Sequence, residues 1–371
     1  MGRPTRAFLN AQALRHNLRR ARSAAPTARV MAVVKANGYG HGLVWVAQTL
    51  KEADAFAVAS IEEGFQLRQA GIRQPIVLLE GFFSADELPA ISHYQLEPVL
   101  HQHEQLRMLE AASVATPLTV WVKVDSGMHR VGFPSHEVAA ACARLRGFGT
   151  VAEIRLMSHF ACADDRNDPA SRAQLDAFLP LVRELALSAS IANSAGILAW
   201  AESHLDWIRP GIMLYGASPM LGESAAYLGL QPVMTLGSAL ISIQRRRRGD
   251  AIGYGGSFRC PEDMPVGVVA VGYGDGYPRH APAGTPVLIN GQAVPLVGRV
   301  SMDMITLDLR RQLQAKVGDP VILWGEGLPI EDIAQAAGTI SYELLTRVAE
   351  RVPRVAASLP ADSKRDAAQP G

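Results

Sequence analysis

Strand-like and helix-like segments alternate eight times over roughly the first 216 residues of the chain. Short apolar runs rich in β-branched residues occur at 30–35, 55–60, 75–80, 96–100, 118–125, 154–159, 191–194 and 208–215. Segments of helical period lie between them, for example 60–70 and 171–187; Asp168-Pro169 before the second suits a helix cap and first turn. This alternation predicts parallel strands in a (β/α)8 barrel, with a doubly wound open sheet as the alternative.

Polar residues at the carboxyl ends of these runs favour the barrel. They are Lys35, Ser60, Glu80, Asp125, His159, Asn193 and Ser194. Barrel enzymes build their active sites at the carboxyl ends of the strands, whereas stability alone requires no polar groups there.

From about residue 231 the strand-like runs follow one another without helices between them. They are 233–244, 266–273, 286–289, 292–297, 304–309 and 320–324. Asn290-Gly291 between two of them predicts a type I′ hairpin turn, because both central residues of that turn need positive φ. We expect a barrel over 10–230, a mainly β domain over 231–358 that could include 1–9, one helix over 329–351, and a disordered tail over 359–371.

Composition excludes several classes of function. A net charge of +1 gives no strong field to attract nucleic acid, and no apolar run is long enough to cross a membrane. Four arginines at 245–248 are expected to be a solvated strand end rather than a nucleic-acid patch. The N-terminus lacks a signal peptide's apolar core. Cys142, Cys162 and Cys260 fit neither a zinc site nor a disulfide framework, so we expect reduced thiols, no metal and a cytoplasmic location.

The segment VVKANGYGHG at 33–42 carries the first chemical signal. Lys35 ends an apolar run, where burial favours the neutral amine, a nucleophile that forms an imine with an aldehyde. Glycines at 38, 40 and 42 let the backbone turn sharply and approach a ligand. A lysine that merely extends to solvent from a strand end explains these residues equally well.

The seventh and eighth runs strengthen the signal. Their ends carry NSAG (193–196) and RPGIMLYG (209–216), with hydroxyl, glycine and backbone N–H groups. Barrels often bind a phosphate at these two loops. A Schiff-base lysine and a phosphate cradle together predict a pyridoxal-phosphate pocket, although ordinary turn chemistry accounts for each motif separately.

The ordered set of motifs resembles the alanine racemase family. VVKANGYGHG is similar to its cofactor-lysine motif, and eight further motifs follow in the family's order between about Phe8 and Arg354. They are KVDSGMHRVGF (123–133), MSHFACAD (157–164), NSAG, RPGIMLYG, IGYGGSF (252–258), VGYGDGYPR (271–279), VGRVSMDM (297–304) and TISYELL (339–345). The resemblance implies a pyridoxal-phosphate barrel followed by a β domain, alanine as substrate, and a homodimer whose β domains complete each other's active sites.

Family roles carry over onto matching residues. Lys35 would form the Schiff base and act as the base on one substrate face, and Tyr254 of the second subunit would act on the other. Arg209 would face the pyridine nitrogen, and His159 would link it to Tyr254. The residues that would hold the cofactor phosphate are Tyr39, Ser194, Gly211, Ile212 and Tyr342.

The remaining roles concern the substrate. Arg130 and the backbone of Met302 would bind its carboxylate, and Lys123 is carbamylated in some members, which would place an anion beside Arg130. The corridor through which substrate enters would be lined by Asp164, Tyr273, Arg279, Arg299 and Ile340.

Two bases on opposite faces suit a racemase, because one base reaches both faces of a planar intermediate with difficulty. Tyrosine is a poor base at neutral pH unless cations favour its phenolate; Arg209 and, if charged, His159 would do so. Guanidinium keeps its proton, so a pyridine nitrogen beside Arg209 stays unprotonated and the ring is a weaker electron sink.

Two other functions remain as alternatives. An amino-acid decarboxylase would also need the lysine, but Arg209 disfavours it because decarboxylation benefits from a protonated ring nitrogen. A non-catalytic carrier would resemble the first domain only, and lacks a counterpart of Tyr254.

The chain departs from several members of the alanine racemase family at Ser190 and Ser301, where those members have His and Cys. D-Alanine would serve peptidoglycan synthesis or be broken down.

Overall fold

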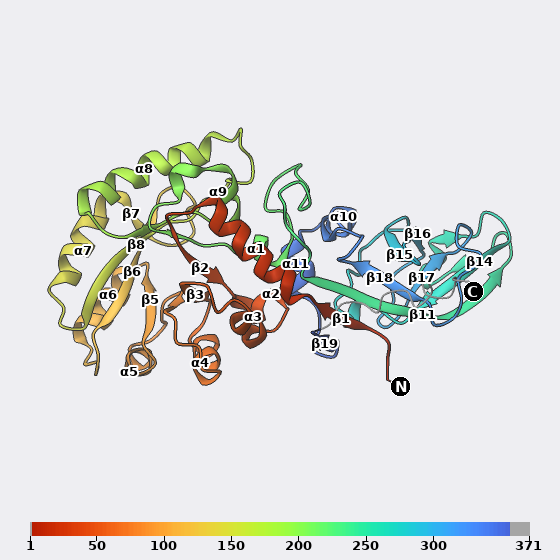
Figure 1. The fold of residues 1–371 in the computed structure, drawn as a ribbon, viewed down its shortest axis with the longest axis horizontal. Helices are drawn as coiled ribbons and strands as arrows, with labels where there is room; N and C mark the ends of the chain where they lie inside the picture. The colour runs from red at the N-terminus through yellow and green to blue at the C-terminus, as the bar shows by residue number, and fades with distance from the viewer. Residues whose placement is uncertain (1, 357–371) are drawn as a thin grey trace, which may run out of the picture. The chain divides into compact units, whose positions relative to one another are not determined.

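A computed structural model describes residues 2–356 and divides into two compact units (Figure 1). One unit is Leu14–Gln231, and the other joins the residues up to Ala13 to the chain from Pro232 onward. The predicted tail at 359–371 lies outside the described residues.

Eight parallel strands close into a barrel in the unit Leu14–Gln231. They are β2 (Arg29–Val33), β3 (Ala55–Val58), β4 (Ile76–Leu78), β5 (Leu96–Leu100), β6 (Leu118–Asp125), β8 (Val151–Met157), β9 (Ala189–Ser190) and β10 (Trp207–Ile208). Their order is β5-β4-β3-β2-β10-β9-β8-β6, and β6 pairs with β5 to complete the ring. A short strand, β7 (Phe133–Pro134), adds beside β6. The barrel prediction is confirmed, and the open sheet is wrong.

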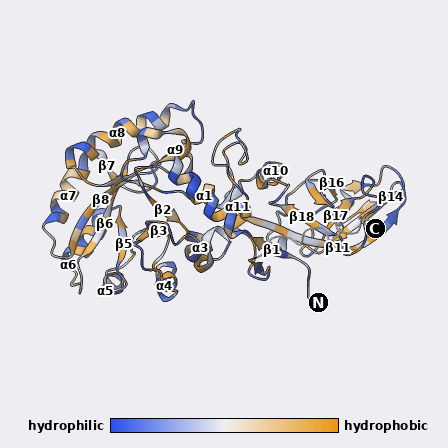
Figure 2. Cartoon of the chain, in the orientation of Figure 1, coloured by the Kyte–Doolittle hydropathy of each residue, from blue (hydrophilic) through white to orange (hydrophobic). Residues whose placement is uncertain are grey.

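Helices cover the outside of these strands. They are α1 (Ala11–Ala24), α3 (Leu43–Thr49), α4 (Ile61–Gln69), α5 (Leu88–His93), α6 (His103–Ala111), α7 (Val138–Arg146), α8 (Pro169–Leu185) and α9 (Ser194–Ala199). The segment labelled α2 (Lys35–Tyr39) is instead a left-handed turn. Figure 2 shows alternating hydrophilic and hydrophobic bands along α7 and α8, as expected of helices that pack one face on a sheet. The helices predicted at 60–70 and 171–187 are α4 and α8; Ser60 caps the first, and Asp168 caps the second by accepting from the Ala170 N–H at 2.8 Å.

The last two strands exist, but their predicted positions are wrong: 191–194 lies just after β9 (Ala189–Ser190), and 208–215 overlaps β10 (Trp207–Ile208) at one residue. β9 ends at Ser190, and Asn193 caps α9 by accepting from the Gly196 N–H at 2.9 Å. β10 ends at Ile208, and Ile212–Tyr215 form a short 3-10 helix, η4. The residues of η4 are apolar because they are buried; a short buried apolar run does not distinguish a strand from other structure.

The second unit contains an eight-stranded sheet. Its strands are β1 (Arg6–Leu9), β11 (Met234–Arg246), β14 (Met264–Val269), β15 (Pro286–Ile289), β16 (Gln292–Val297), β17 (Ile305–Asp308), β18 (Pro320–Trp324) and β19 (Arg354–Val355). A separate small ribbon pairs β12 (Ala251–Ile252) with β13 (Phe258–Arg259). The hairpin prediction is confirmed: Asn290 and Gly291 between β15 and β16 have φ of 49° and 74°.

The helix predicted over 329–351 is wrong as a single element. It consists of α10 (Ile330–Ala336) and α11 (Ser341–Thr346), separated at Gly338, which has φ of 65°. A residue in this left-handed conformation ends a helix. The arginines at 245–248 are exposed at the end of β11 and in the turn after it. Within residues 2–356, no helix is both long and apolar enough to span a membrane.

Candidate active site

Lys35 stands at the start of a left-handed turn that follows the first barrel strand. All five residues at 36–40 have positive φ, between 50° and 78°. Three of them, Ala36, Asn37 and Tyr39, are not glycine. Left-handed backbone costs about 1–2 kcal/mol for each such residue. Contacts from the rest of the barrel must therefore hold the turn.

Asn37 and Glu63 supply part of that support. The Asn37 side-chain oxygen accepts from the Leu43 N–H at 2.8 Å. The Glu63 carboxylate of α4 accepts from the backbone N–H groups of Asn37 at 3.2 Å and Ala59 at 2.9 Å. Neither residue was predicted from the sequence, although Asn37 lies within the VVKANGYGHG motif.

Four predicted phosphate-binding residues come together in the barrel unit. The Ser194 hydroxyl accepts from the backbone N–H groups of Gly211 at 2.8 Å and Met213 at 3.4 Å. A Cβ placed on Gly211 would lie 2.7 Å from the Tyr39 hydroxyl oxygen, so that hydroxyl approaches the Gly211–Ile212 backbone where only glycine fits. Hydroxyl and backbone N–H groups gathered in a tight turn are suited to an anion.

Arg209 is buried against neutral acceptors. Its guanidinium donates to the Ser190 hydroxyl and the Ser158 carbonyl, both at 2.5 Å, and to the Ile191 carbonyl at 3.3 Å. A further N–H lies 3.1 Å from His159 Nδ1. Burial lowers the pKa of Arg209 to about 9, so it remains a cation at neutral pH.

His159 is neutral. Burial, followed by the neighbouring cations Lys123 and Arg209, holds its pKa well below the usual value. Because the Arg209 guanidinium can only donate, Nδ1 accepts and the ring proton is on Nε2. Of the two groups expected to favour the Tyr254 phenolate, Arg209 is therefore the cation.

The neutral state of His159 predicts an acid-sensitive stability. Its folded-state pKa lies below the ordinary 6.5, so the unfolded chain binds more protons between those two values. The contribution of His159 to the free energy of unfolding should be fully present above about pH 6.5. Below that pH the free energy of unfolding should fall by up to roughly 1.4 kcal/mol per pH unit. Urea unfolding between pH 7 and 5 would measure the slope. His159→Gln should reduce it and the surface variant His136→Gln should not; equal slopes in both variants would contradict the assignment.

Lys123, on β6, is a second buried group in this region whose pKa is lowered. Burial, then Arg209 and Arg130, holds its pKa well below the usual value. Asp125, two residues further along, accepts from the backbone N–H groups of Gly127 at 3.1 Å and His129 at 3.0 Å. Arg130 is exposed in the same loop, and Asp164 lies in the loop that follows β8.

The predicted residues of the second unit lie on its surface. Tyr254 is 68% exposed in a turn whose glycines 253, 255 and 256 all have positive φ. A Cβ on Gly255 would lie 3.2 Å from the Arg299 guanidinium, so this turn and Arg299 are neighbours. Other predicted residues with exposed side chains are Tyr273, Arg279, Met302, Ile340 and Tyr342.

Tyr273 and Met302 are brought together by backbone hydrogen bonds. The Tyr273 N–H donates to the Ser301 carbonyl at 3.0 Å, and the next N–H donates to the Met302 carbonyl at 2.9 Å. Buried Asp275 supports this pair of loops through ion pairs with Arg3 and Arg351. This support was not predicted from the sequence. Asp275 lies within the GYGDGY motif and could have indicated it, whereas Arg3 lies in no motif.

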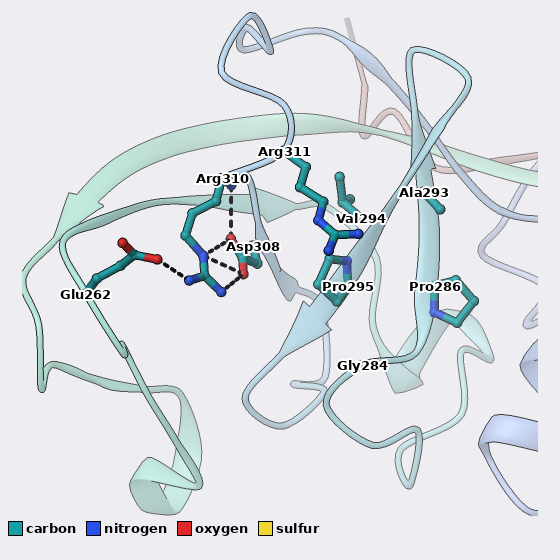
Figure 3. Close-up of a pocket in the computed structure, with 9 residues that line it drawn as sticks. All are labelled: Glu262, Gly284, Pro286, Ala293, Val294, Pro295, Asp308, Arg310 and Arg311. Atoms are coloured by element: carbon teal, nitrogen blue, oxygen red, sulfur yellow. Dashed lines mark hydrogen bonds and ion pairs between the residues drawn. The ribbon is translucent and has the colours of Figure 1, made fainter.

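The second unit also contains a hollow of about 530 Å³, and none of the predicted site residues lines it (Figure 3). Arg310 at its rim is paired with Asp308 at 2.7 Å and with Glu262. Arg311 and Pro295 also line it (Figure 3). This hollow shares no residue with the candidate active site.

Comparison with known proteins gives one family over nearly the whole chain. The model of the alanine racemase N-terminal domain matches residues 9–219, and that of the C-terminal domain matches residues 233–356. The alanine racemase of Nitrosococcus oceani is 56% identical over 94% of this chain and 98% of its own length. The biosynthetic alanine racemase of Escherichia coli O6:H1 is 52% identical, over 93% of this chain and 97% of its own.

Solved structures agree with the sequence relatives. The biosynthetic alanine racemase of Pseudomonas aeruginosa is 47% identical, with a TM-score of 0.94 over 96% of this chain and 100% of that one. The alanine racemase of Acinetobacter baumannii is 40% identical, with a TM-score of 0.91 over 96% of this chain and 100% of that one. The chain therefore belongs to the alanine racemase family of enzymes.

Proposed function

We propose that this chain interconverts L- and D-alanine with pyridoxal phosphate as cofactor. The observation that carries the proposal is the meeting of Tyr39, Ser194 and the Gly211 backbone in one barrel, at the turn that begins with Lys35. The family is known to use pyridoxal phosphate, and relatives that match nearly the whole chain are alanine racemases.

The residues present fit the cofactor. The Ser194 and Tyr39 hydroxyls and the Gly211–Ile212 backbone would donate to a phosphate dianion, and Tyr342 of a second chain would add another donor. Without the phosphate, the Gly211 N–H donates to the Ser194 hydroxyl oxygen. Lys35 supplies the amine that would attach the cofactor. When bound, the cofactor supplies an aldehyde carbon and a conjugated ring that withdraws electrons from the substrate's α-carbon.

Two side chains would transfer the proton of the substrate's α-carbon. Lys35 Nζ would remove or return it on one face of the substrate, and the Tyr254 hydroxyl would act on the opposite face. Arg209 would face the pyridine nitrogen as a hydrogen-bond donor that keeps its own proton. Because His159 is neutral, Arg209 rather than His159 would supply the positive charge that favours the Tyr254 phenolate.

The substrate would be held by its carboxylate. Arg130 would pair with it, and the backbone of Met302 would donate a second hydrogen bond. The corridor to the site would be lined by Asp164, Tyr273, Arg279, Arg299 and Ile340. A carbamate on Lys123, as some members of the family carry, would place an anion beside Arg130; the lowered pKa of Lys123 favours the neutral amine, which is the form that reacts with carbon dioxide.

The active enzyme would be a homodimer in which Tyr254, Met302 and Tyr342 act on the barrel of the other subunit. All three side chains are exposed. Mixing inactive Lys35→Ala and Tyr254→Phe proteins, with exchange of subunits, should restore up to roughly a quarter of wild-type activity, because half the dimers regain one intact site. An inactive mixture in which mixed dimers are detected would contradict shared sites.

Chiral chromatography tests the substrate. The protein, incubated with pyridoxal phosphate, should convert L-alanine to an equal mixture of enantiomers. It should do so faster than it converts L-serine or longer amino acids. Carbon dioxide release from an amino acid without racemisation would contradict the proposal. A cytoplasmic location is part of the proposal; Cys142, Cys162 and Cys260 are free thiols, the state that a reducing compartment maintains.

A further inference from the structure

Tyr215 lies behind the left-handed turn and touches two parts of it. Its hydroxyl donates to the Val33 carbonyl at 3.0 Å, at the end of the strand that precedes Lys35. Its ring stacks on the Tyr39 ring, with centroids 4.5 Å apart and planes 19° apart. Both tyrosines are buried. One side chain thus fixes the strand end and the ring of a candidate phosphate ligand.

His41 supports the same turn from its other end. Its Nδ1 lies 2.8 Å from the Tyr39 carbonyl oxygen and 3.1 Å from the Gly38 carbonyl oxygen. Carbonyl oxygens only accept, so Nδ1 carries a proton and donates to the turn. The His41 ring also packs on the Tyr215 ring, with centroids 4.8 Å apart. His41 and Tyr215 therefore act on the turn together.

Tyr215 also belongs to the phosphate loop. It ends η4, the short helix that starts at Ile212 directly after Gly211. The contact between Tyr39 and Tyr215 consequently joins the turn after Lys35 to the loop whose N–H groups would meet the phosphate. Burial raises the pKa of Tyr215 well above its usual value, which keeps the hydroxyl protonated as a donor to Val33.

We propose that Tyr215, assisted by His41, is a positioning residue that preforms the phosphate site of the cofactor by holding Tyr39 and the left-handed turn in place. Residues in sparsely populated backbone conformations persist only where neighbours determine them, and the turn has three such non-glycine residues. The inference rests on the proposed use of pyridoxal phosphate. Neither Tyr215 nor His41 is among the residues proposed to touch the cofactor.

Tyr215→Phe tests the inference, because it keeps the ring and removes only the hydroxyl. Full-length wild-type and variant proteins, freed of cofactor, would be titrated with pyridoxal phosphate and with pyridoxamine phosphate. The second compound has no aldehyde, so it reports the phosphate and ring sites without bonding to Lys35. We expect both dissociation constants to rise roughly tenfold, the effect of one hydrogen bond. Alanine KM at saturating cofactor should stay near wild type.

Tyr277→Phe is the matched control. Tyr277 is equally buried, lies in the other unit, and its hydroxyl has no hydrogen-bond partner among the described residues. The same chemical change there should leave both dissociation constants unchanged. Thermal unfolding of each variant would establish that it is folded before binding is compared.

Two outcomes would overturn the inference. One is a folded Tyr215→Phe protein that binds both compounds as wild type does. The other is a loss confined to pyridoxal phosphate, which would leave the phosphate site intact. Should Tyr215→Phe fail to fold, His41→Phe decides: it keeps a ring against Tyr215 but removes the donor, and wild-type affinity would overturn the inference. Failure of the wild-type protein to bind either compound would instead contradict the proposed function.

Discussion

Replacing Lys35 with alanine should abolish racemisation, with a loss of at least about 10³-fold in kcat. The variant loses both the covalent attachment of the cofactor and the base on one substrate face, and a positioned base alone contributes roughly 10²–10⁴-fold. Chiral chromatography of the reaction products measures the loss. Visible absorbance should show no lysine-linked cofactor, although the cofactor can still enter the separate cradle around Ser194.

Lys51→Ala is the control for this experiment. Lys51 is an exposed lysine of the same unit, so its replacement makes the same chemical change without touching the turn after β2. Its activity should match wild type. Racemisation by Lys35→Ala at the wild-type rate would remove Lys35 from the mechanism and would leave the left-handed turn without a catalytic purpose.

Replacing Tyr254 with phenylalanine should block proton transfer on one face only. The variant should still bind pyridoxal phosphate, because the barrel residues are unchanged. Exchange of the α-proton with deuterated solvent should fall by roughly 10²–10⁴-fold for one enantiomer and persist for the other, which Lys35 serves. NMR of each pure enantiomer incubated separately measures the two exchange rates.

Tyr227→Phe provides the comparison. Tyr227 is even more exposed than Tyr254, at 78% against 68%, and lies in the barrel unit. The Tyr227→Phe variant should exchange the α-proton of both enantiomers at wild-type rates. Equal loss for both enantiomers in Tyr254→Phe would assign Tyr254 a structural part, and no loss for either would exclude it as a base.

The long elements of the fold could be predicted from local sequence. α8 was expected because the helical period runs for several turns after the Asp168 cap, and the β15–β16 hairpin because Asn290-Gly291 suits positive φ at both positions. The loops after β9 and β10 could not be, because Ile212 and Leu214 are apolar through burial by distant segments. Periodicity contains no information about such burial.

The candidate site was predictable in its residue types but not in its physical state. The glycines of 38–42 predicted a sharp turn, but its left-handed course depends on contacts such as that between Tyr215 and Val33, 182 residues apart. The neutrality of His159 depends on burial and on cations from other strands, Lys123 and Arg209 among them. Long-range packing of this kind cannot be read from a motif.

Proton exchange by the wild-type enzyme tests the central claim most directly. L-Alanine would be incubated with the enzyme and pyridoxal phosphate in deuterated water, and the enantiomers separated and examined by mass spectrometry. D-Alanine should accumulate to an equal share and carry deuterium at the α-carbon, because Lys35 and Tyr254 remove and return the proton on opposite faces. Deuterated L-alanine without any D-alanine, or release of carbon dioxide in its place, would contradict that claim.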